Sequence, residues 1–436
     1  MTIPSAARIT ISGPAITLVA TLISIYVVSQ FLRNSIGVIA PNLAAELALS
    51  AAEVGLLSSV FFLSFAAVQI PLGMALDRFG ARRCLVVGAA ITVAGAIVFA
   101  TAQSPTVLIL GRALFGIGVA GALVAPLAVY AKRFAPDRFA TLAGLHAGIG
   151  TAGSLFATAP LAFATATIGW RNSFLVVGAF TMLIGVLIAV VVADDAPSGS
   201  GRRETLRESL AGIVEVLRLP SLGRLFAMNL VIYSSFALVV GLWGGPYLTH
   251  IYGYSLEERG NLLLVPVLTQ MVGLVAWGPT DRLMRSHRRP VLLGAGGTAI
   301  MLAYLALNEK LTPFGLIVWF AAFGFLAGFG PVLLAHGKAM FPPHQVGRGL
   351  TILNVASMGG TFLIQAISGL VIGQFPATQD GGYALAAYRL VFALQAGIIL
   401  LMCLIYFGSR DPMEDSVEDA SPQAADDKKR APGATK

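Results

Sequence analysis

The sequence predicts an all-α membrane protein in which twelve transmembrane helices form two similar six-helix bundles. The chain of 436 residues is 56% hydrophobic and only 11% charged, whereas soluble domains carry about 25% charged residues. Apolar runs of about 18 residues or more recur along the chain, and each can cross a hydrocarbon core about 30 Å thick. A short charged signature also occurs twice between apolar runs, which predicts two related halves.

The expected spans follow one another with short loops, except for one longer loop in the middle. They cover residues 15–41, 53–76, 84–102, 106–132, 140–163, 171–193, 223–248, 258–281, 290–307, 314–341, 348–374 and 386–408. This predicts five regions: an N-terminus at 1–14, a first bundle at 15–193, a linker at 194–222, a second bundle at 223–408 and a tail at 409–436. Several spans exceed 20 residues, which predicts tilted or bent helices.

The linker and the tail differ in composition from the spans. The linker begins with a flexible Asp-, Ser- and Gly-rich stretch. Leu206, Leu210 and Leu217 then recur at helical spacing among Arg and Glu, which predicts an amphipathic surface helix. The tail after Ser409 is rich in Asp, Glu, Ala, Pro and Lys, so we expect it to be disordered.

The distribution of Lys and Arg predicts the orientation in the membrane. With both termini in the cytoplasm, the inner loops and tails hold 23 of the 29 basic residues, as cytoplasmic loops prefer. The net charge of +8 therefore follows from topology, and no nucleic-acid partner is expected. We expect a monomeric, multi-pass protein of the bacterial inner (plasma) membrane that contacts the lipid bilayer. Its two cysteines, Cys84 and Cys403, form no disulfide framework or metal site, and no cofactor is expected.

The repeated signature lies after the second span of each half. It runs from Gly73 to Arg83 and again from Gly278 to Arg289. An aspartate recurs at the same loop in both copies, and topology alone does not select acidic residues there. An aspartate at a helix end can hold an arginine or a helix N-terminus of the neighbouring bundle. The candidate residues of the two loops are Gly73, Asp77, Arg78, Gly80, Arg82, Arg83, Asp281 and Arg282.

On these motifs the chain resembles the major facilitator superfamily. The segment Gly73–Arg83 is similar to its loop between helices two and three, and Arg112–Gly118 resembles its Arg-x-x-x-Gly-x-Gly motif in helix four. The resemblance implies alternating access of two bundles and a gating role for the eight loop residues, with the first loop as a cytoplasmic latch that stabilises the outward-open state. The stretch Gly148–Pro160 lacks the Gly-Pro pair of drug antiporters, and Arg33–Pro41 looks more like the anion-carrying symporter branches.

Two arginines stand out because they lie inside predicted spans. Arg33 and Arg112 are expected at similar depths, so they could face one cavity. A buried arginine costs several kcal/mol and points to a functional site, and its fork suits carboxylate or phosphate oxygens. The alternative is an arginine that extends to the outer interface, which is more plausible for Arg112 than for Arg33. No Asp or Glu lies deep in a span, which favours an anionic substrate.

Other polar and aromatic residues complete the predicted site. Each also has a purely structural reading, because buried amides bridge helices, histidines hydrogen-bond in cores and Trp243 suits an interface belt. His146 and His336 are the candidates for proton coupling. The further substrate-binding candidates are Asn34, His146, Tyr233, Trp243, Asn354 and Gln365.

The sequence thus predicts a secondary active transporter of a small anionic solute that works by alternating access, with protons as a candidate coupling ion. One alternative is a proton-coupled exporter of amphipathic compounds, and another is a membrane sensor that does not transport. An enzyme is not expected, because the sequence holds no His-Glu-x-x-His or Gly-x-Ser-x-Gly motif. The sequence also lacks a Gly-x-x-x-x-Gly-Lys-Ser/Thr loop for nucleotide binding.

Overall fold

The computed structural model describes residues 13–193, 215, 219, 222–342, 345–378 and 381–414. Within these ranges eleven helices are long and apolar enough to cross a membrane, and the shorter apolar helix α2 (Ala51–Ala67) completes the set of twelve. No β-strand occurs in this part of the chain. The predicted all-α membrane fold of twelve spans is confirmed.

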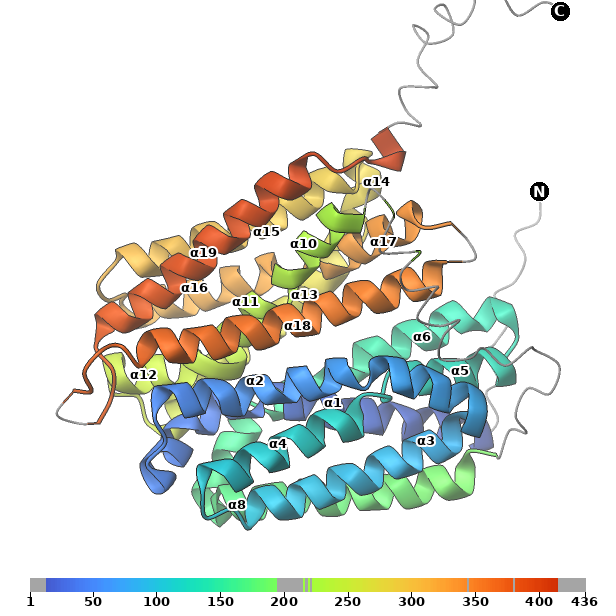
Figure 1. Cartoon of the computed structure of the whole chain (residues 1–436), viewed down its shortest axis with the longest axis horizontal. Coiled ribbons are helices and arrows are strands. Elements are labelled where there is room, and N and C mark those ends of the chain that lie inside the picture. The colour runs from blue at the N-terminus through green and yellow to red at the C-terminus, as the bar shows by residue number, and fades with distance from the viewer. Residues whose placement is uncertain are drawn as a thin grey trace, which may run out of the picture.

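Figure 1 shows two layers of helices, the first half below and the second half above. The first half contains α1 (Gly13–Leu47), α2, α3 (Gln69–Ala100), α4 (Pro105–Val119), α5 (Val124–Arg133), α6 (Pro136–Gly150), α7 (Ala152–Phe156) and α8 (Ala159–Val191). The second half contains α10 (Leu222–Ile232), α11 (Ser234–Leu238), the π-helical turn η1 (Val239–Trp243), α12 (Gly244–Tyr252), α13 (Leu256–Trp277), α14 (Thr280–Met284), α15 (Arg288–Leu307), α16 (Pro313–Leu326), α17 (Gly330–Met340), α18 (Val346–Ile372) and α19 (Leu385–Phe407). We call the end where α1 begins and α19 ends the terminal end, and the other the opposite end.

The two halves begin matching helices with matching caps. Ser50 and Glu53 form a capping box at the start of α2, and Ser255 and Glu258 form the same box at the start of α13. Ser104 and Thr312 likewise cap α4 and α16, each directly before a proline. Such caps satisfy the free amide groups at a helix start. The same caps recur in the same order in both halves, as expected for a duplicated six-helix unit.

Two expected loops are single glycines in the structure. The loop predicted between the second and third spans is replaced by Gly80, at φ 79°, inside α3. The loop predicted between the fifth and sixth spans is replaced by Gly169, at φ 78°, inside α8. A positive φ is a conformation that glycine adopts without strain. The chain therefore turns sharply at one residue, and the spans extend further than predicted.

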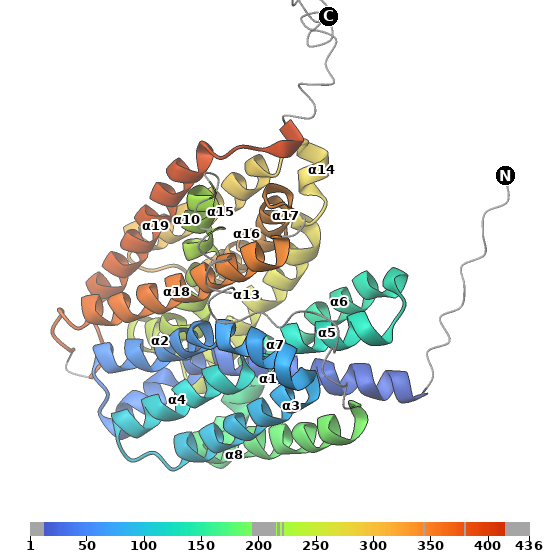
Figure 2. The ribbon, with the colours of Figure 1, turned by 45° about the vertical axis from the view of Figure 1, so that its right-hand side comes forward.

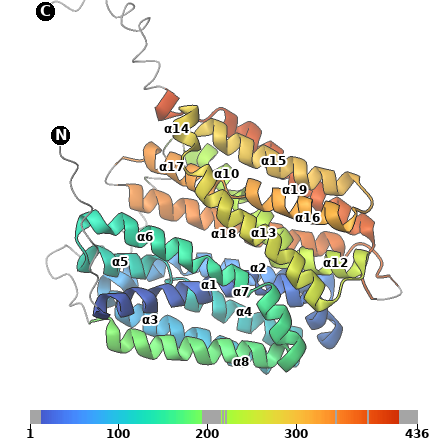
Figure 3. The ribbon, with the colours of Figure 1, turned by 180° about the vertical axis from the view of Figure 1, so that it is seen from behind.

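The halves touch most closely toward the opposite end. Figures 1 and 3 show α2 beside α18 and α13 beside the start of α8. At these contacts glycines allow backbones to meet: a Cβ on Gly37 would lie 1.9 Å from the Val240 carbonyl oxygen, and one on Gly55 would lie 2.8 Å from Gly369 Cα. Toward the terminal end the ribbons of the two halves diverge (Figure 2). The structure is therefore a conformation closed at the opposite end.

We expect Gly37→Ala to destabilise this closure, because the new methyl group cannot fit against the Val240 backbone. With Cys84 and Cys403 replaced by serine, Ser58→Cys reports on closure, since Ser58 is buried and donates to the Gly241 carbonyl oxygen at 3.4 Å. The expected result is labelling of this cysteine several times faster than in the parent. Gly359→Ala is the matched control, because a Cβ there meets no atom within 4 Å. Equal rates in both variants would contradict the steric argument.

The chain stays ordered past the point where the sequence predicted the disordered tail. Asp411 is buried, and its carboxylate accepts hydrogen bonds from the Ser286 hydroxyl at 2.8 Å and the Arg288 amide at 2.9 Å. Glu414 pairs with the Arg288 guanidinium at 2.6 Å. Residues 409–414 therefore pack on the loop before α15, which corrects the predicted boundary at 409. Residues 415–436 and nearly all of the predicted amphipathic helix lie outside the described residues.

Candidate functional site

Arg33 is buried between the two halves without an acidic partner. It lies on α1 and is 9% exposed. The carbon centre of its guanidinium lies 4.4 Å from the centre of the Phe65 ring on α2, and Nη1 donates to the sulfur of Met358 on α18 at 3.5 Å. Its Nε has no hydrogen-bond partner, and no carboxylate among the described residues pairs with it. A buried charge left in this state has unused capacity to bind an anion.

Asn34 links Arg33's surroundings to the second half. Its amide nitrogen donates to the Ser154 hydroxyl at 3.0 Å, and its carbonyl oxygen accepts from the Tyr233 hydroxyl at 3.4 Å. The Tyr233 ring also packs on Phe62, with the ring centres 5.9 Å apart. Polar and aromatic groups from α1, α2, α7 and the start of α11 thus converge beside Arg33.

Arg112 has a different environment from Arg33. Its side chain is fully buried, and the guanidinium donates to the carbonyl oxygens of Leu32 on α1 at 2.6 Å and Leu57 on α2 at 3.3 Å. It also lies over the Phe61 ring, 4.9 Å from its centre. The geometry ties α4 to both helices that carry Arg33 and Phe65. The structure therefore places Arg112 inside the first bundle, and not at the outer interface.

The predicted residues of the second half differ in how close they lie to this cluster. Gln365 is fully buried, donates to the Ala237 carbonyl oxygen at 2.9 Å and keeps an unpartnered carbonyl oxygen. Trp243 is fully buried and donates to the Ser368 hydroxyl at 2.7 Å. Asn354 is exposed, four residues before Met358 on α18. Gln365 lies where the halves meet, because a Cβ on Gly55 of α2 would lie 2.9 Å from its backbone oxygen.

Both candidate proton-coupling histidines have two hydrogen-bond partners. The ring of His146 contacts the Tyr130 hydroxyl at 3.1 Å through Nδ1 and the Ala122 carbonyl oxygen at 3.1 Å through Nε2. His336 contacts the Tyr406 hydroxyl at 2.5 Å and the Arg410 carbonyl oxygen at 2.9 Å in the same way. A carbonyl requires a donor, so the neutral ring protonated on Nε2 satisfies both partners. This arrangement favours the structural interpretation of both rings.

The first-half gating loop is largely exposed in this conformation. Asp77 and Arg78 are exposed, and Asp77 has no hydrogen bond or ion pair within the described residues. Gly73 is equally open, because a Cβ added there would meet no atom within 4 Å. Arg82 donates to the Ala189 carbonyl oxygen on α8, and Arg83 is exposed. The acidic residue of this loop is thus available for a partner in another conformation.

The corresponding aspartate of the second half is not available in this way. Asp281 is buried, its carboxylate accepts from the Arg282 amide at 2.6 Å, and it lies 3.3 Å from His287 Nδ1. Arg282 itself is exposed. The two copies of the signature therefore differ: the second is fixed within its own half, while the first is open.

We expect Asp77→Asn to leave stability unchanged here and to alter the balance of conformations. The exposed carboxylate has no hydrogen bond or ion pair to lose among the described residues, whereas the charge would be missing from a latch formed in the other conformation. Labelling of Ser58→Cys should therefore become slower, opposite to the effect of Gly37→Ala. Asp137→Asn, at another exposed aspartate, is the control. Unchanged labelling and transport would leave the loop as a topology signal only.

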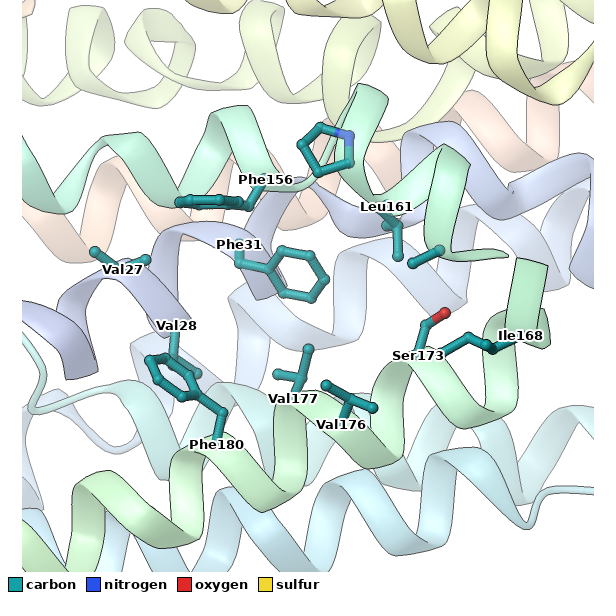
Figure 4. A pocket seen from close by; sticks show the side chains of 12 residues that line it. Val27, Val28, Phe31, Phe156, Leu161, Ile168, Ser173, Val176, Val177 and Phe180 are labelled. Atoms are coloured by element: carbon teal, nitrogen blue, oxygen red, sulfur yellow. The ribbon is translucent and has the colours of Figure 1, made fainter. Parts of the chain in front are cut away.

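A well-formed cavity lies elsewhere, on the side of the first bundle. It measures about 360 Å³ and lies between α1, α7 and α8. Figure 4 shows its apolar lining, including Val28, Phe31, Phe156 and Phe180. Phe156 and Val176 on its wall are more than half exposed, so the cavity opens to the lipid-facing side. By helical spacing Arg33 points from the opposite face of α1, and none of the predicted site residues lines this cavity.

Sequence reasoning missed the two residues that contact the Arg33 guanidinium. Phe65 and Met358 are apolar residues on apolar helices, a type that usually packs in a core. The signal for Phe65 is its spacing from Phe61 and Phe62 on α2, which puts a continuous aromatic face beside an arginine helix. For Met358 the sequence offers no signal, because the register between the halves decides the contact.

A twelve-span bundle with a polar cluster where its halves meet is the architecture of a polytopic membrane protein and is typical of transporters. The sequence profile of the Major Facilitator Superfamily matches residues 22–245 and 225–433, and the chain belongs to this superfamily. The predicted family is thereby confirmed, and so is the prediction that the protein is a transporter.

Curated relatives include proteins with different named roles. The chain is 26% identical over 331 residues to the multidrug resistance protein MdtL of Salmonella heidelberg, covering 74% of this chain and 80% of the relative. It is 27% identical over 265 residues to the probable sulfoacetate transporter SauU of Cupriavidus necator, covering 57% and 60%. The uncharacterized transporter YybO of Bacillus subtilis is 30% identical over 38% of this chain and 39% of its own length.

Solved structures share the fold at low sequence identity. A bacterial homologue of the human lysosomal transporter Spinster, in an inward-facing and unoccupied conformation, superimposes with a TM-score of 0.74 at 18% identity over 91% of this chain and 97% of its own. The nucleoside transporter NupG superimposes with a TM-score of 0.71 at 12% identity, over 90% and 98%.

Proposed function

We propose that this transporter carries a small organic anion, with Arg33 as the group that binds the negative charge. The observation that carries the proposal is a guanidinium buried between the halves without a carboxylate partner among the described residues. A carboxylate or sulfonate at this guanidinium would form charge-assisted hydrogen bonds. The similarity to a probable sulfoacetate transporter supports the same substrate class.

We propose that the terminal end faces the cytoplasm of a bacterial cell, because the basic loops lie there. The conformation of the structure is then inward-open, as is the Spinster homologue that it resembles. Alternating access would exchange the glycine contacts at the opposite end for a latch at Asp77. Asn34, Tyr233 and Gln365 are the polar groups proposed to complete the anion site.

Arg112 has a supporting role in this proposal. Two of its nitrogens donate to carbonyl oxygens of α1 and α2, and Nη2 is buried without a partner. We assign to Arg112 the positioning of the helices that carry Arg33 and Phe65, and to Arg33 the binding of the anion. His146 is proposed to stabilise the first bundle through Tyr130 and Ala122. Proton coupling is then tested separately, by imposing a pH gradient across proteoliposomes.

The test is uptake of labelled sulfoacetate, lactate and benzoate into proteoliposomes containing the purified protein. We expect saturable uptake of at least one anion and none in protein-free vesicles. Uptake of the same compounds' uncharged amides should be absent. A transporter that moves none of the three anions but moves cations would overturn the proposal.

Export of amphipathic compounds is the second candidate, because the MdtL match covers 74% of the chain. The unpaired Arg33 argues against it, since the site holds positive charge and would repel cationic drugs. Ethidium efflux from inverted vesicles distinguishes the two functions. Anion uptake without ethidium efflux favours the anion transporter.

A further inference from the structure

Met358 occupies the position at which an anion would meet Arg33. The thioether of Met358 comes from α18 in the second half and accepts from Arg33 Nη1 at 3.5 Å, while Phe65 covers one face of the guanidinium. The neighbouring Nε is sealed from solvent and has no partner. Nη1, to which the sulfur is bound, forms with Nη2 one of the two edges of the guanidinium that suit a bidentate carboxylate, while Nε belongs to the other edge.

We propose that Met358 is a placeholder for the substrate's anionic group, which the arriving anion displaces. This inference rests on the anion-binding role of Arg33. A thioether is a weak acceptor, so a carboxylate or sulfonate competes with it easily for the same donors. An unbranched methionine side chain can also move aside at little cost. The substrate class that fits is a small molecule with a single planar or tetrahedral oxyanion group.

The exchange of partners also changes a contact between the two halves. Arg33 belongs to the first half and Met358 to the second, 325 positions later in the chain. When an anion takes the guanidinium edge, this direct link between α1 and α18 is lost and the substrate stands between them. A ligand shifts a conformational equilibrium only through contacts that differ between states. Displacement of Met358 supplies such a difference.

The test uses two substitutions of opposite expected effect. Met358→Leu keeps the side-chain volume and removes the hydrogen-bond acceptor. The anion then has no sulfur to displace from Arg33 and should bind about two- to tenfold more tightly, which is the range of one net hydrogen bond. Met358→Gln installs a stronger acceptor and should weaken binding by a similar factor. The affinities of sulfoacetate, lactate and benzoate are measured by calorimetry in detergent. Met228→Leu, at a buried methionine on α10, is the matched control and should change nothing.

A structural role for Met358 predicts a different pattern, in which both substitutions weaken binding together, and that result would overturn the proposal. Arg33→Ala separates the two hypotheses. If it leaves affinity unchanged, the anion-binding role of Arg33 is wrong. If it abolishes binding while the two Met358 variants shift affinity in the same direction, only the placeholder role is wrong.

A second measurement needs no ligand. Without substrate, Met358→Gln should raise the melting temperature by about 1–3 °C when Arg33 is present and not in the Arg33→Leu background, because the gain depends on the guanidinium. Equal shifts in both backgrounds would contradict the contact on which the proposal stands, whichever anion the protein carries.

Discussion

Arg33→Ala is expected to abolish anion transport while the protein still folds. The side chain is buried, its guanidinium contacts the Phe65 ring face and the Met358 sulfur, and no carboxylate among the described residues pairs with it. Removing it therefore leaves no buried opposite charge unpaired, and we expect the substitution to lower substrate affinity more than stability. Losing a buried, hydrogen-bonded charge partner costs about 2–5 kcal/mol, which corresponds to at least a thirtyfold weaker affinity. Uptake in proteoliposomes and calorimetry on the same preparation measure the effect.

Arg33→Lys keeps the charge and removes the planar fork, so it separates geometry from charge. We expect affinity between that of the parent and that of Arg33→Ala. Arg285→Lys, at an exposed arginine of the second half, is the control for the same chemical change away from the site. If Arg33→Ala and Arg33→Lys both lower the yield of folded protein but leave the affinity of the remainder intact, Arg33 is a structural residue.

Arg112→Ala is expected to have the larger effect on stability. Its guanidinium fills a fully buried space and holds the carbonyl oxygens of Leu32 and Leu57 across three helices. Truncation leaves a cavity and removes two charge-assisted hydrogen bonds, for which a loss of about 3–5 kcal/mol is expected. Thermal unfolding in detergent should show a fall of about 5 °C or more.

The matched comparison for this prediction is Arg112→Lys, which keeps one donor. It should recover part of the stability, because an ammonium group reaches one carbonyl and not both. Anion affinity of the folded fraction should fall less than in Arg33→Ala. If Arg112→Ala kept the stability of the parent and lost affinity for the anion, the roles assigned to Arg33 and Arg112 would be wrong.

The fold could be predicted from the sequence to a large extent. The repeated Asp-Arg signature and the long apolar runs indicated twelve spans in two halves, and family membership confirmed this. The exact turns could not be predicted, since a polar stretch around Gly80 or Gly169 fits a loop as well as a one-residue reversal. The packing of residues 409–414 was also missed, because an acidic, proline-containing tail carries no sign of the buried Asp411 contact.

The candidate site was harder to predict than the fold. Their positions along the predicted spans placed Arg33 and Arg112 at similar depths in the membrane. Depth does not show in which direction a side chain points around its helix. Carbonyl oxygens that hold Arg112 are present at every residue and leave no mark in the sequence. Phe65 and Met358 are apolar, so only the packing of the two halves distinguishes them from core residues. Affinity measurements on the Arg33 and Met358 variants decide whether these residues bind substrate.

The glycine contact between α1 and the η1–α12 segment has a consequence for how this protein can vary. Gly37 and Gly245 bring main chains together without a side chain of their own between them, so this contact itself freezes no rotamers and costs no side-chain entropy. A substitution at either position would leave each bundle able to fold. It would change instead the relative free energies of the two states of the transport cycle, so such variants should differ in turnover and not in yield.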